Sequence, residues 1–74
     1  MATADLTRQH HDVLRLLCTG ATDKAVGAQL GISDRTVRRL VRDACDHYGV
    51  AGRMQLGVIL GQLGIVIVSL ANAA

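Results

Sequence analysis

The sequence has no proline, no tryptophan and no phenylalanine, and Tyr48 is its only residue of the Phe, Trp and Tyr class. A core without large rings must be built from leucine, valine, isoleucine and alanine, which favours small packed helices over a β-sandwich. Without proline, helix boundaries must be inferred from capping residues and glycines. We therefore expect an all-α fold.

Cysteine is scarce, and a secretory signal peptide is missing from the N-terminus. Cys18 and Cys45 lie inside apolar periodic segments without CxxC spacing. Intracellular chains rarely keep disulfides, so we expect two free thiols and a cytoplasmic location. The adjacent His10 and His11 would project about 100° apart on a helix, and no Cys/His ligand spacing is present, so no metal site is expected.

No arrangement of catalytic residues is visible. The sequence has no phosphate-cradling glycine loop and no paired glutamates, and Ser33 is better explained as a helix cap than as a nucleophile. We expect neither enzymatic activity nor a cofactor.

Acidic and basic residues are absent from positions 54–74, while four of the eight basic residues fall within eight positions: Arg35, Arg38, Arg39 and Arg42. The net charge of +2 says little about partners, but this concentration on one segment is typical of a nucleic-acid-binding surface. The 74 residues make one domain, which buries only about 60–65% of its unfolded surface and would gain stability from a partner subunit.

Four helices are expected from apolar periodicity and caps. The first spans about 7–19, and the second begins at Thr22 or Asp23 and ends before Gly31. Ser33 caps a third helix over 34–48, which Gly49 ends. The fourth opens near Arg53 and continues as one long apolar helix, with residues 59–74 as its extension.

The third expected helix has two unlike faces. At 100° per residue, an apolar face formed by Val37, Leu40, Val41, Ala44 and Tyr48 lies opposite the four arginines. Gly27, Gly31 and Val37 match the spacing of a helix-turn-helix, in which a small residue allows close helix approach and a glycine makes the turn. The second helix of such a unit presents its N-terminal half to the major groove of DNA.

The sequence resembles the LuxR-type (GerE, NarL-like) DNA-binding domains over about residues 6–58. The resemblance is carried by Leu6-Thr7, Val13 to Leu17, Gly20 to Lys24, Leu30 to Ser33, Thr36 to Arg38, Tyr48 to Val50 and Arg53. It implies a four-helix domain that binds double-stranded DNA as a transcriptional regulator. A homodimer formed through the fourth helix is implied as well.

By position, the resemblance implies that Arg38, Arg39 and Arg42 point at base edges or nearby phosphates. Lys24 and Thr36 would contact phosphates, and Ser33 and Arg35 complete the predicted DNA-binding set. The sequence departs from the family pattern at His10, where a glutamate usually closes a capping box with Thr7, and at Gly27, where alanine is preferred. We expect each departure to cost about 0.5–1 kcal/mol of stability.

The apolar tail allows two interpretations. In the first it dimerises, with Leu56, Ile59, Leu60, Leu63, Ile67 and Leu70 as the contact surface. In the second, the chain is an interaction protein that uses residues 54–74 to bind another regulator or a membrane, since 21 uncharged residues could cross a bilayer. Gln55, Gln62 and the glycines of this segment argue against membrane insertion.

Relatives of this kind usually carry a receiver or ligand-sensing domain before the DNA-binding module. No such domain is present in these residues, so the chain is either the output part of a larger regulator or a stand-alone protein. The operator and the sign of regulation are not encoded in any recognisable motif.

Overall fold

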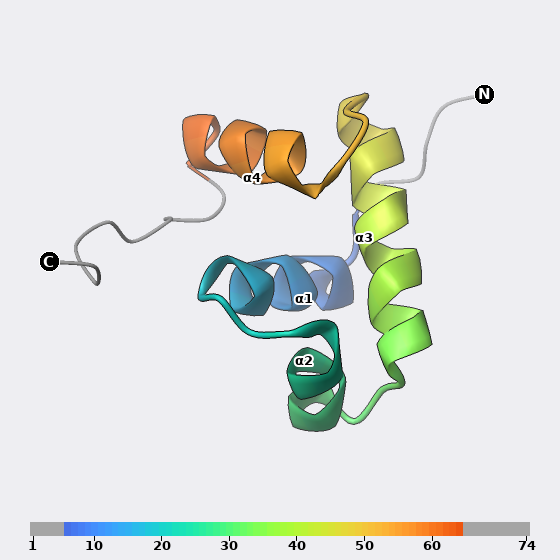
Figure 1. The fold of residues 1–74 in the computed structure, drawn as a ribbon. Coiled ribbons are helices and arrows are strands. Elements are labelled where there is room, and N and C mark those ends of the chain that lie inside the picture. The colour runs from blue at the N-terminus through green and yellow to red at the C-terminus, as the bar shows by residue number, and fades with distance from the viewer. Residues whose placement is uncertain (1–5, 65–74) are drawn as a thin grey trace, which may run out of the picture.

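A computed structural model describes residues 6–64 as four helices joined by short loops: α1 (Arg8–Cys18), α2 (Asp23–Leu30), α3 (Asp34–Tyr48) and α4 (Arg53–Gln62). Helix α3 forms one side of the molecule (Figure 1). Helices α1 and α4 lie against the same side of α3, and α2 packs near its N-terminal end. The all-helical, four-helix expectation is confirmed for the described residues.

Helix α1 begins with a capping box that the sequence did not lead us to expect. The Thr7 hydroxyl accepts a hydrogen bond from the His10 amide at 3.3 Å, and the Thr7 amide donates to His10 Nδ1 at 3.1 Å. The expected loss of the box was therefore wrong, because an imidazole nitrogen can accept the bond that a glutamate oxygen usually accepts. His10 Nε2 also lies 3.1 Å from Asp43 Oδ2, which joins α1 to α3.

The α2–α3 unit follows the sequence-based expectation closely. Thr22 caps α2 by accepting from the Ala25 amide at 3.1 Å. Gly31 ends the helix with a left-handed φ of 73°, a conformation that glycine adopts without steric cost. Ser33 then caps α3 by accepting from the Thr36 amide at 3.0 Å. This is a helix-turn-helix.

Gly27 has a structural role that reverses the expectation drawn from helix propensity. A Cβ placed on Gly27 would lie 2.5 Å from the Ile32 carbonyl oxygen and 3.3 Å from the Asp34 amide nitrogen. Both neighbours are backbone atoms of the tight turn, so neither can rotate away. Glycine is required here by the close approach of the turn to α2.

We therefore expect Gly27→Ala to destabilise the domain by about 1–2 kcal/mol, because the close backbone contact puts the overpacking cost near the upper end of about 1–3 kcal/mol and the helix-propensity gain offsets only about 1 kcal/mol. Gly57→Ala is the matched control, since a Cβ at this interior position of α4 meets nothing within 4 Å. The control should be neutral or stabilising. Chemical denaturation of both variants measures the difference, and a Gly27→Ala protein more stable than wild type would contradict the steric argument.

Helix α4 is shorter than the sequence analysis anticipated. It ends at Gln62 with Leu63 as its C-cap, and Gly64 has a φ of 70°. The long apolar helix is therefore not seen as one continuous element past this point. The rest of the expected extension, which includes Ile67 and Leu70, lies outside the described residues. None of the described helices is both long and apolar enough to cross a bilayer.

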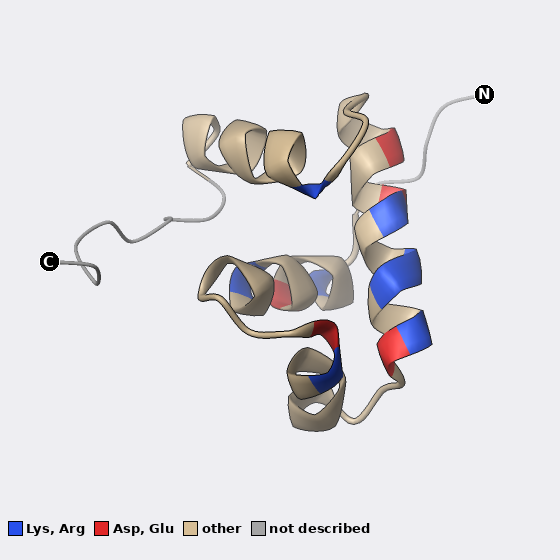
Figure 2. Ribbon diagram, viewed as in Figure 1, with Lys and Arg blue, Asp and Glu red and all other residues tan. Residues whose placement is uncertain are grey.

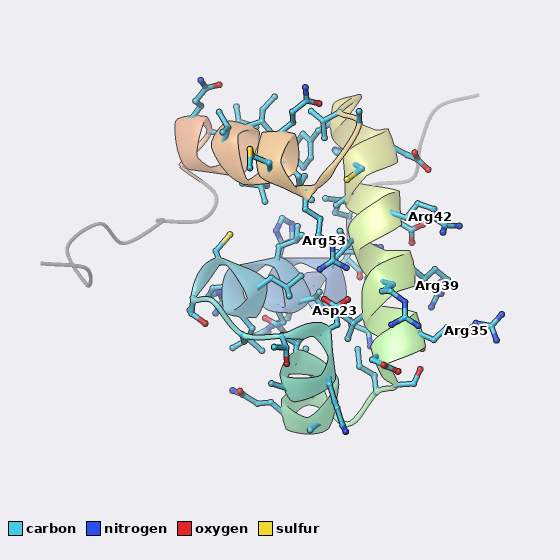
Figure 3. All side chains as sticks on the ribbon, viewed as in Figure 1. Asp23, Arg35, Arg39, Arg42 and Arg53 are labelled. Carbon is cyan, nitrogen blue, oxygen red and sulfur yellow. The ribbon has the colours of Figure 1, made fainter. Side chains whose placement is uncertain are left out.

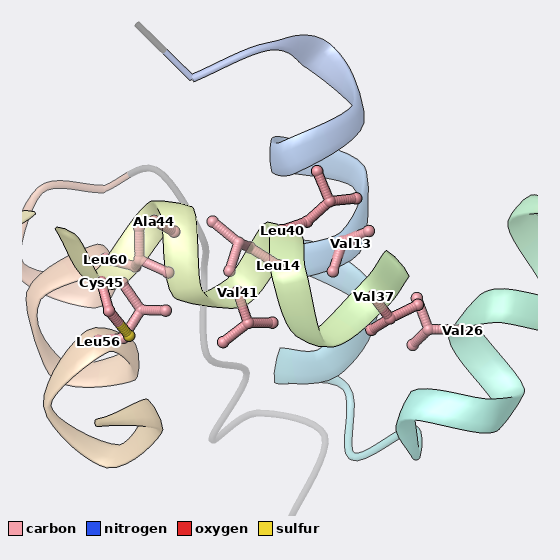
Figure 4. Close-up of a cluster of buried hydrophobic side chains, with 10 residues drawn as sticks. All are labelled: Val13, Leu14, Val26, Val37, Leu40, Val41, Ala44, Cys45, Leu56 and Leu60. Carbon is pink, nitrogen blue, oxygen red and sulfur yellow. The ribbon is translucent and has the colours of Figure 1, made fainter. Parts of the chain in front are cut away.

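The core lies where α1, α3 and α4 meet and extends to α2 (Figure 4). Its buried members are Val13, Leu14, Val26, Val37, Leu40, Val41, Ala44, Cys45, Leu56 and Leu60. Cys18 and Cys45 are both free thiols, and burial raises the pKa of each. The apolar stripe of α3 predicted from periodicity supplies four of these core residues, Val37, Leu40, Val41 and Ala44, while Tyr48 is only partly buried and Cys45 takes the fifth core position on α3.

Two of the residues expected to form a dimer surface belong to this core instead. Leu56 and Leu60 are 2% and 1% exposed, and they pack against α3 within the same chain. Their side chains cannot reach a second subunit, because the helix turns them toward the domain interior. Ile59 is half-buried against the core, and Leu63 is exposed.

Candidate nucleic-acid interface

The exposed face of α3 is cationic over the N-terminal half of the helix. Basic residues follow one another down the outer side of the helix, away from the other three helices (Figure 2). Arg35, Arg39 and Arg42 point outward from this side (Figure 3). The packing of Val37, Leu40 and Val41 into the core fixes this orientation, since each of these arginines is two positions from one of them and so projects about 200° away around the helix.

The arginines share one shallow cleft with Thr36. Its volume is about 440 Å³, and its walls are Arg35, Thr36, Arg38, Arg39 and Arg42. Arg38 Nη1 lies 3.4 Å from Asp34 Oδ2, a long contact between two exposed side chains. Such a pair contributes little and opens readily. The cleft can therefore offer all four guanidinium groups to an anionic partner.

Ser33 and Thr36 stand at the N-terminal end of this cationic face. Their hydroxyl oxygens are 2.9 Å apart, and Ser33 also accepts from the Thr36 amide. Ser33 is thus occupied as the α3 cap, as expected. Helix N-termini attract anions such as phosphate.

Lys24 is exposed on α2 and does not line the arginine cleft. Of the seven residues predicted to bind DNA, the structure thus brings five together in the cleft and places Ser33 at its end. Lys24 belongs to the other helix of the helix-turn-helix, where it could meet DNA only beyond the limits of the cleft.

A second charged contact, which the sequence analysis missed, supports this arrangement. Arg53 at the start of α4 donates two hydrogen bonds to Asp23 at the start of α2, with N–O distances of 2.6 and 2.8 Å (Figure 3). The two residues are 30 positions apart, so no local spacing rule connects them. The only signal in the sequence was that Arg53 is its last charged residue. The pair fastens α4 to the helix-turn-helix.

The bidentate contact makes part of the stability depend on pH. The Arg53 guanidinium holds the pKa of Asp23 below its ordinary value of 3.8, against a smaller opposing effect of burial. A carboxylate with a lowered folded-state pKa stabilises the fold above the unfolded pKa, and this contribution is lost as the pH falls through the lower, folded-state pKa.

We expect Asp23→Asn to lower the free energy of unfolding by about 0.5–1 kcal/mol at neutral pH, since Arg53 is half-exposed and water screens the pair. The deficit relative to wild type should shrink as the pH falls below about 4. Denaturation curves at several pH values measure it. Asp12→Asn, which removes an exposed pair with Arg15 on α1, is the control and should change stability less. A deficit independent of pH would refute the electrostatic origin.

Helix α4 presents a separate apolar surface. Met54, Val58 and Leu63 are 85%, 57% and 56% exposed. Met54 and Val58 line a shallow hollow with Gly57 and Gly61. The glycines leave the helix backbone accessible, so another helix could approach closely there.

Comparison with known proteins agrees with this geometry. The family model of the bacterial regulatory proteins of the LuxR family matches residues 4–60. The chain is 37% identical over 59 residues to the spore germination protein GerE of Bacillus subtilis (strain 168), a match that covers 80% of each chain. It is 43% identical over 53 residues to the bialaphos biosynthetic pathway regulatory protein of Streptomyces hygroscopicus.

The match to the bialaphos regulatory protein covers 72% of this chain but only 21% of that protein. A solved structure of the transcription factor GerE superposes with a TM-score of 0.82 at 31% identity, over 86% of this chain and 96% of that one. The fold and the position of the cationic helix are therefore shared with a protein described as a transcription factor.

Proposed function

Because the chain belongs to the LuxR family of bacterial regulatory proteins, which are DNA-binding regulators of transcription, we propose that it reads DNA by placing the N-terminal half of α3 in the major groove. The observation that carries this proposal is the outward-facing arginine cleft on α3. All residues that line the cleft belong to one helix, and the major groove admits a single α-helix. A regulator of this kind acts where the DNA is, which supports a cytoplasmic location.

We assign the specificity to the guanidinium groups. An arginine can donate two parallel bonds to the O6 and N7 atoms of guanine, and each such pair discriminates by about 1–3 kcal/mol against another base. Arg38, Arg39 and Arg42 are the candidates for base edges and adjacent phosphates, with Arg35 beside them. Lys24, Ser33 and Thr36 are assigned to phosphates, which position the helix without specifying sequence.

We further propose that the protein binds DNA as a homodimer through α4. The support is the exposed apolar surface of Met54 and Val58 beside Gly57 and Gly61. These residues replace Leu56 and Leu60 of the original expectation, which are buried in their own core. A two-fold dimer would require two half-sites about one helical turn of DNA apart.

An upstream receiver or ligand-sensing domain is consistent with one of the two relatives. The chain spans 80% of GerE but only about a fifth of the bialaphos regulatory protein. Both a short regulator and a module of a longer regulator therefore occur among proteins similar to this one.

Selection from random duplex DNA, followed by sequencing, tests sequence-specific DNA binding. We expect an enriched pseudo-palindrome whose affinity falls steeply with salt, because arginines displace condensed counterions from the phosphates. A folded protein that enriches no sequence, even at low salt, would contradict sequence-specific binding.

The dimer proposal has its own test in Val58→Glu. The added charge would be buried between two α4 helices, so we expect a monomer in sedimentation analysis and a loss of about 10² or more in affinity for the full palindrome, while binding to one half-site is unchanged. Gln9→Glu on α1 adds the same charge at an exposed site and is the matched control. A dimeric Val58→Glu protein would refute α4 as the interface.

A further inference from the structure

Helix α4 and the C-terminal half of α1 enclose an apolar groove, distinct from the arginine cleft. Its volume is about 420 Å³, and the residues at its walls include Leu14, Leu17, Cys18, Met54, Gly57 and Leu60. Gly57 contributes no side chain, and a Cβ there would meet nothing within 4 Å. The groove is therefore open along the flank of α4.

The described residues that line the groove offer no unpaired charged side chain that could bind a polar partner. Among the described residues that line it, Arg53 alone is charged. Both of its outer guanidinium nitrogens donate to Asp23, at 2.6 and 2.8 Å. An occupant that is apolar and uncharged is the one that fits these walls, because a charged group would be desolvated there without a partner.

The chain supplies such an occupant directly after α4. Residues 65–74 contain no charged side chain, and Ile65, Val66, Ile67, Val68 and Leu70 follow in close succession. An apolar run of this kind exposed to water would favour association with other chains. Burial in an apolar groove removes this hazard and the cost of hydrating the run.

The end of α4 brings this segment within reach of the groove. Leu60, which lines the groove, precedes Gly64 by one turn of helix. Gly64 has a φ of 70°, so the backbone leaves the right-handed helical conformation at this residue. Ten extended residues span about 33 Å at most, whereas the ten residues of α4 span about 15 Å. The segment is thus long enough to return along the whole flank of α4.

We propose that residues 65–74 dock back into the groove between α1 and α4 and cover its apolar walls. The tether favours this occupant over a second copy of the chain, because a short linker gives an effective concentration in the millimolar range. The docked segment would cover Met54 and Gly57, which also belong to the proposed dimer surface, and would leave Val58 and Gly61 on the outer side of α4 free. The proposal is independent of DNA binding.

Cys18 provides a probe of the groove, and Cys45 an internal control. Cys18 lines the groove and is half-buried, whereas Cys45 lies in the core at 9% exposed. In the full chain, pulse alkylation followed by mass spectrometry gives the modification rate of each thiol separately. We expect Ile67→Asp to raise the rate at Cys18 several-fold and to leave Cys45 slow. Asn72→Asp adds the same charge at a polar position of the segment and should match wild type.

Equal Cys18 rates in wild type and Ile67→Asp would overturn the proposal. A second measurement does not depend on the stability of that variant. Cysteines introduced singly as Val66→Cys, Ile67→Cys and Ser69→Cys are oxidised mildly in the full chain, and at least one is expected to form an intramolecular disulfide with Cys18, whose formation requires close approach of the two Cα atoms. If only intermolecular disulfides form, the groove binds a second copy of the chain. If no disulfide forms at any of the three positions, residues 65–74 do not occupy the groove. Either result refutes docking.

Discussion

Simultaneous replacement of Arg38, Arg39 and Arg42 by alanine is expected to abolish sequence-specific DNA binding while the domain stays folded. If these guanidinium groups contact bases and phosphates, their combined loss should cost at least about 3 kcal/mol, or a factor of roughly 10² or more in Kd. The salt dependence should also weaken, by about 0.9 in slope for each phosphate contact removed. Fluorescence-anisotropy titrations of the selected duplex at two salt concentrations measure both effects.

The fold should survive because all three side chains are exposed on α3. Within residues 6–64 these three side chains make one ion pair, between Arg38 and Asp34. It is a long surface pair, whose loss changes stability by about 0.5 kcal/mol or less. Arg8→Ala with Arg15→Ala removes two positive charges from α1, against three in the triple replacement, and controls for most of the change in net charge. If this control weakened binding as much as the triple replacement, general electrostatic attraction and not the α3 face would be responsible.

Leu60→Ala is expected to destabilise the domain by about 2–5 kcal/mol, the usual range for truncating a fully buried leucine. Leu60 is 1% exposed and packs among Ala44, Cys45 and Leu56 (Figure 4). A domain of this size has a total stability of only about 4–11 kcal/mol. The substitution should therefore lower the melting temperature sharply and unfold a measurable fraction of the protein.

Leu63→Ala is the matched control, because Leu63 lies three residues after Leu60, at the C-cap of α4, but is 56% exposed. We expect its stability to stay within about 0.5 kcal/mol of wild type. Denaturation at a concentration too low for dimers separates the core contribution of Leu60 from any interface contribution. Equal effects of the two substitutions would contradict the assignment of Leu60 to the core of its own chain.

The cationic face of α3 could be predicted from the sequence because its determinants are local. A helix period fixes which residues oppose Val37 and Leu40 once those enter the core. The caps at Thr7, Thr22 and Ser33 needed only a hydroxyl three positions before an unsatisfied amide. The order and bounds of the first three helices followed from these signals.

The errors arose where one residue could serve two purposes. An apolar position on α4 fits either a core or an interface, and only the placement of α4 against α3 shows that Leu56 and Leu60 face inward while Val58 faces outward. Helix propensity alone predicts that Gly27 destabilises α2. Glycine is nevertheless necessary at this position, because the Ile32 carbonyl oxygen lies too close to leave room for a Cβ.

The sequence by itself thus determined the helix-turn-helix, the family and the cationic face, because each depends on residues within a few turns of one another. Only the tertiary structure decided which apolar side of α4 is buried, that His10 closes the capping box while reaching Asp43, and that Arg53 binds Asp23. These two side-chain contacts join residues 33 and 30 positions apart. Contacts between residues so far apart in the sequence depend on how the helices pack, which the spacing of residues along the chain does not predict.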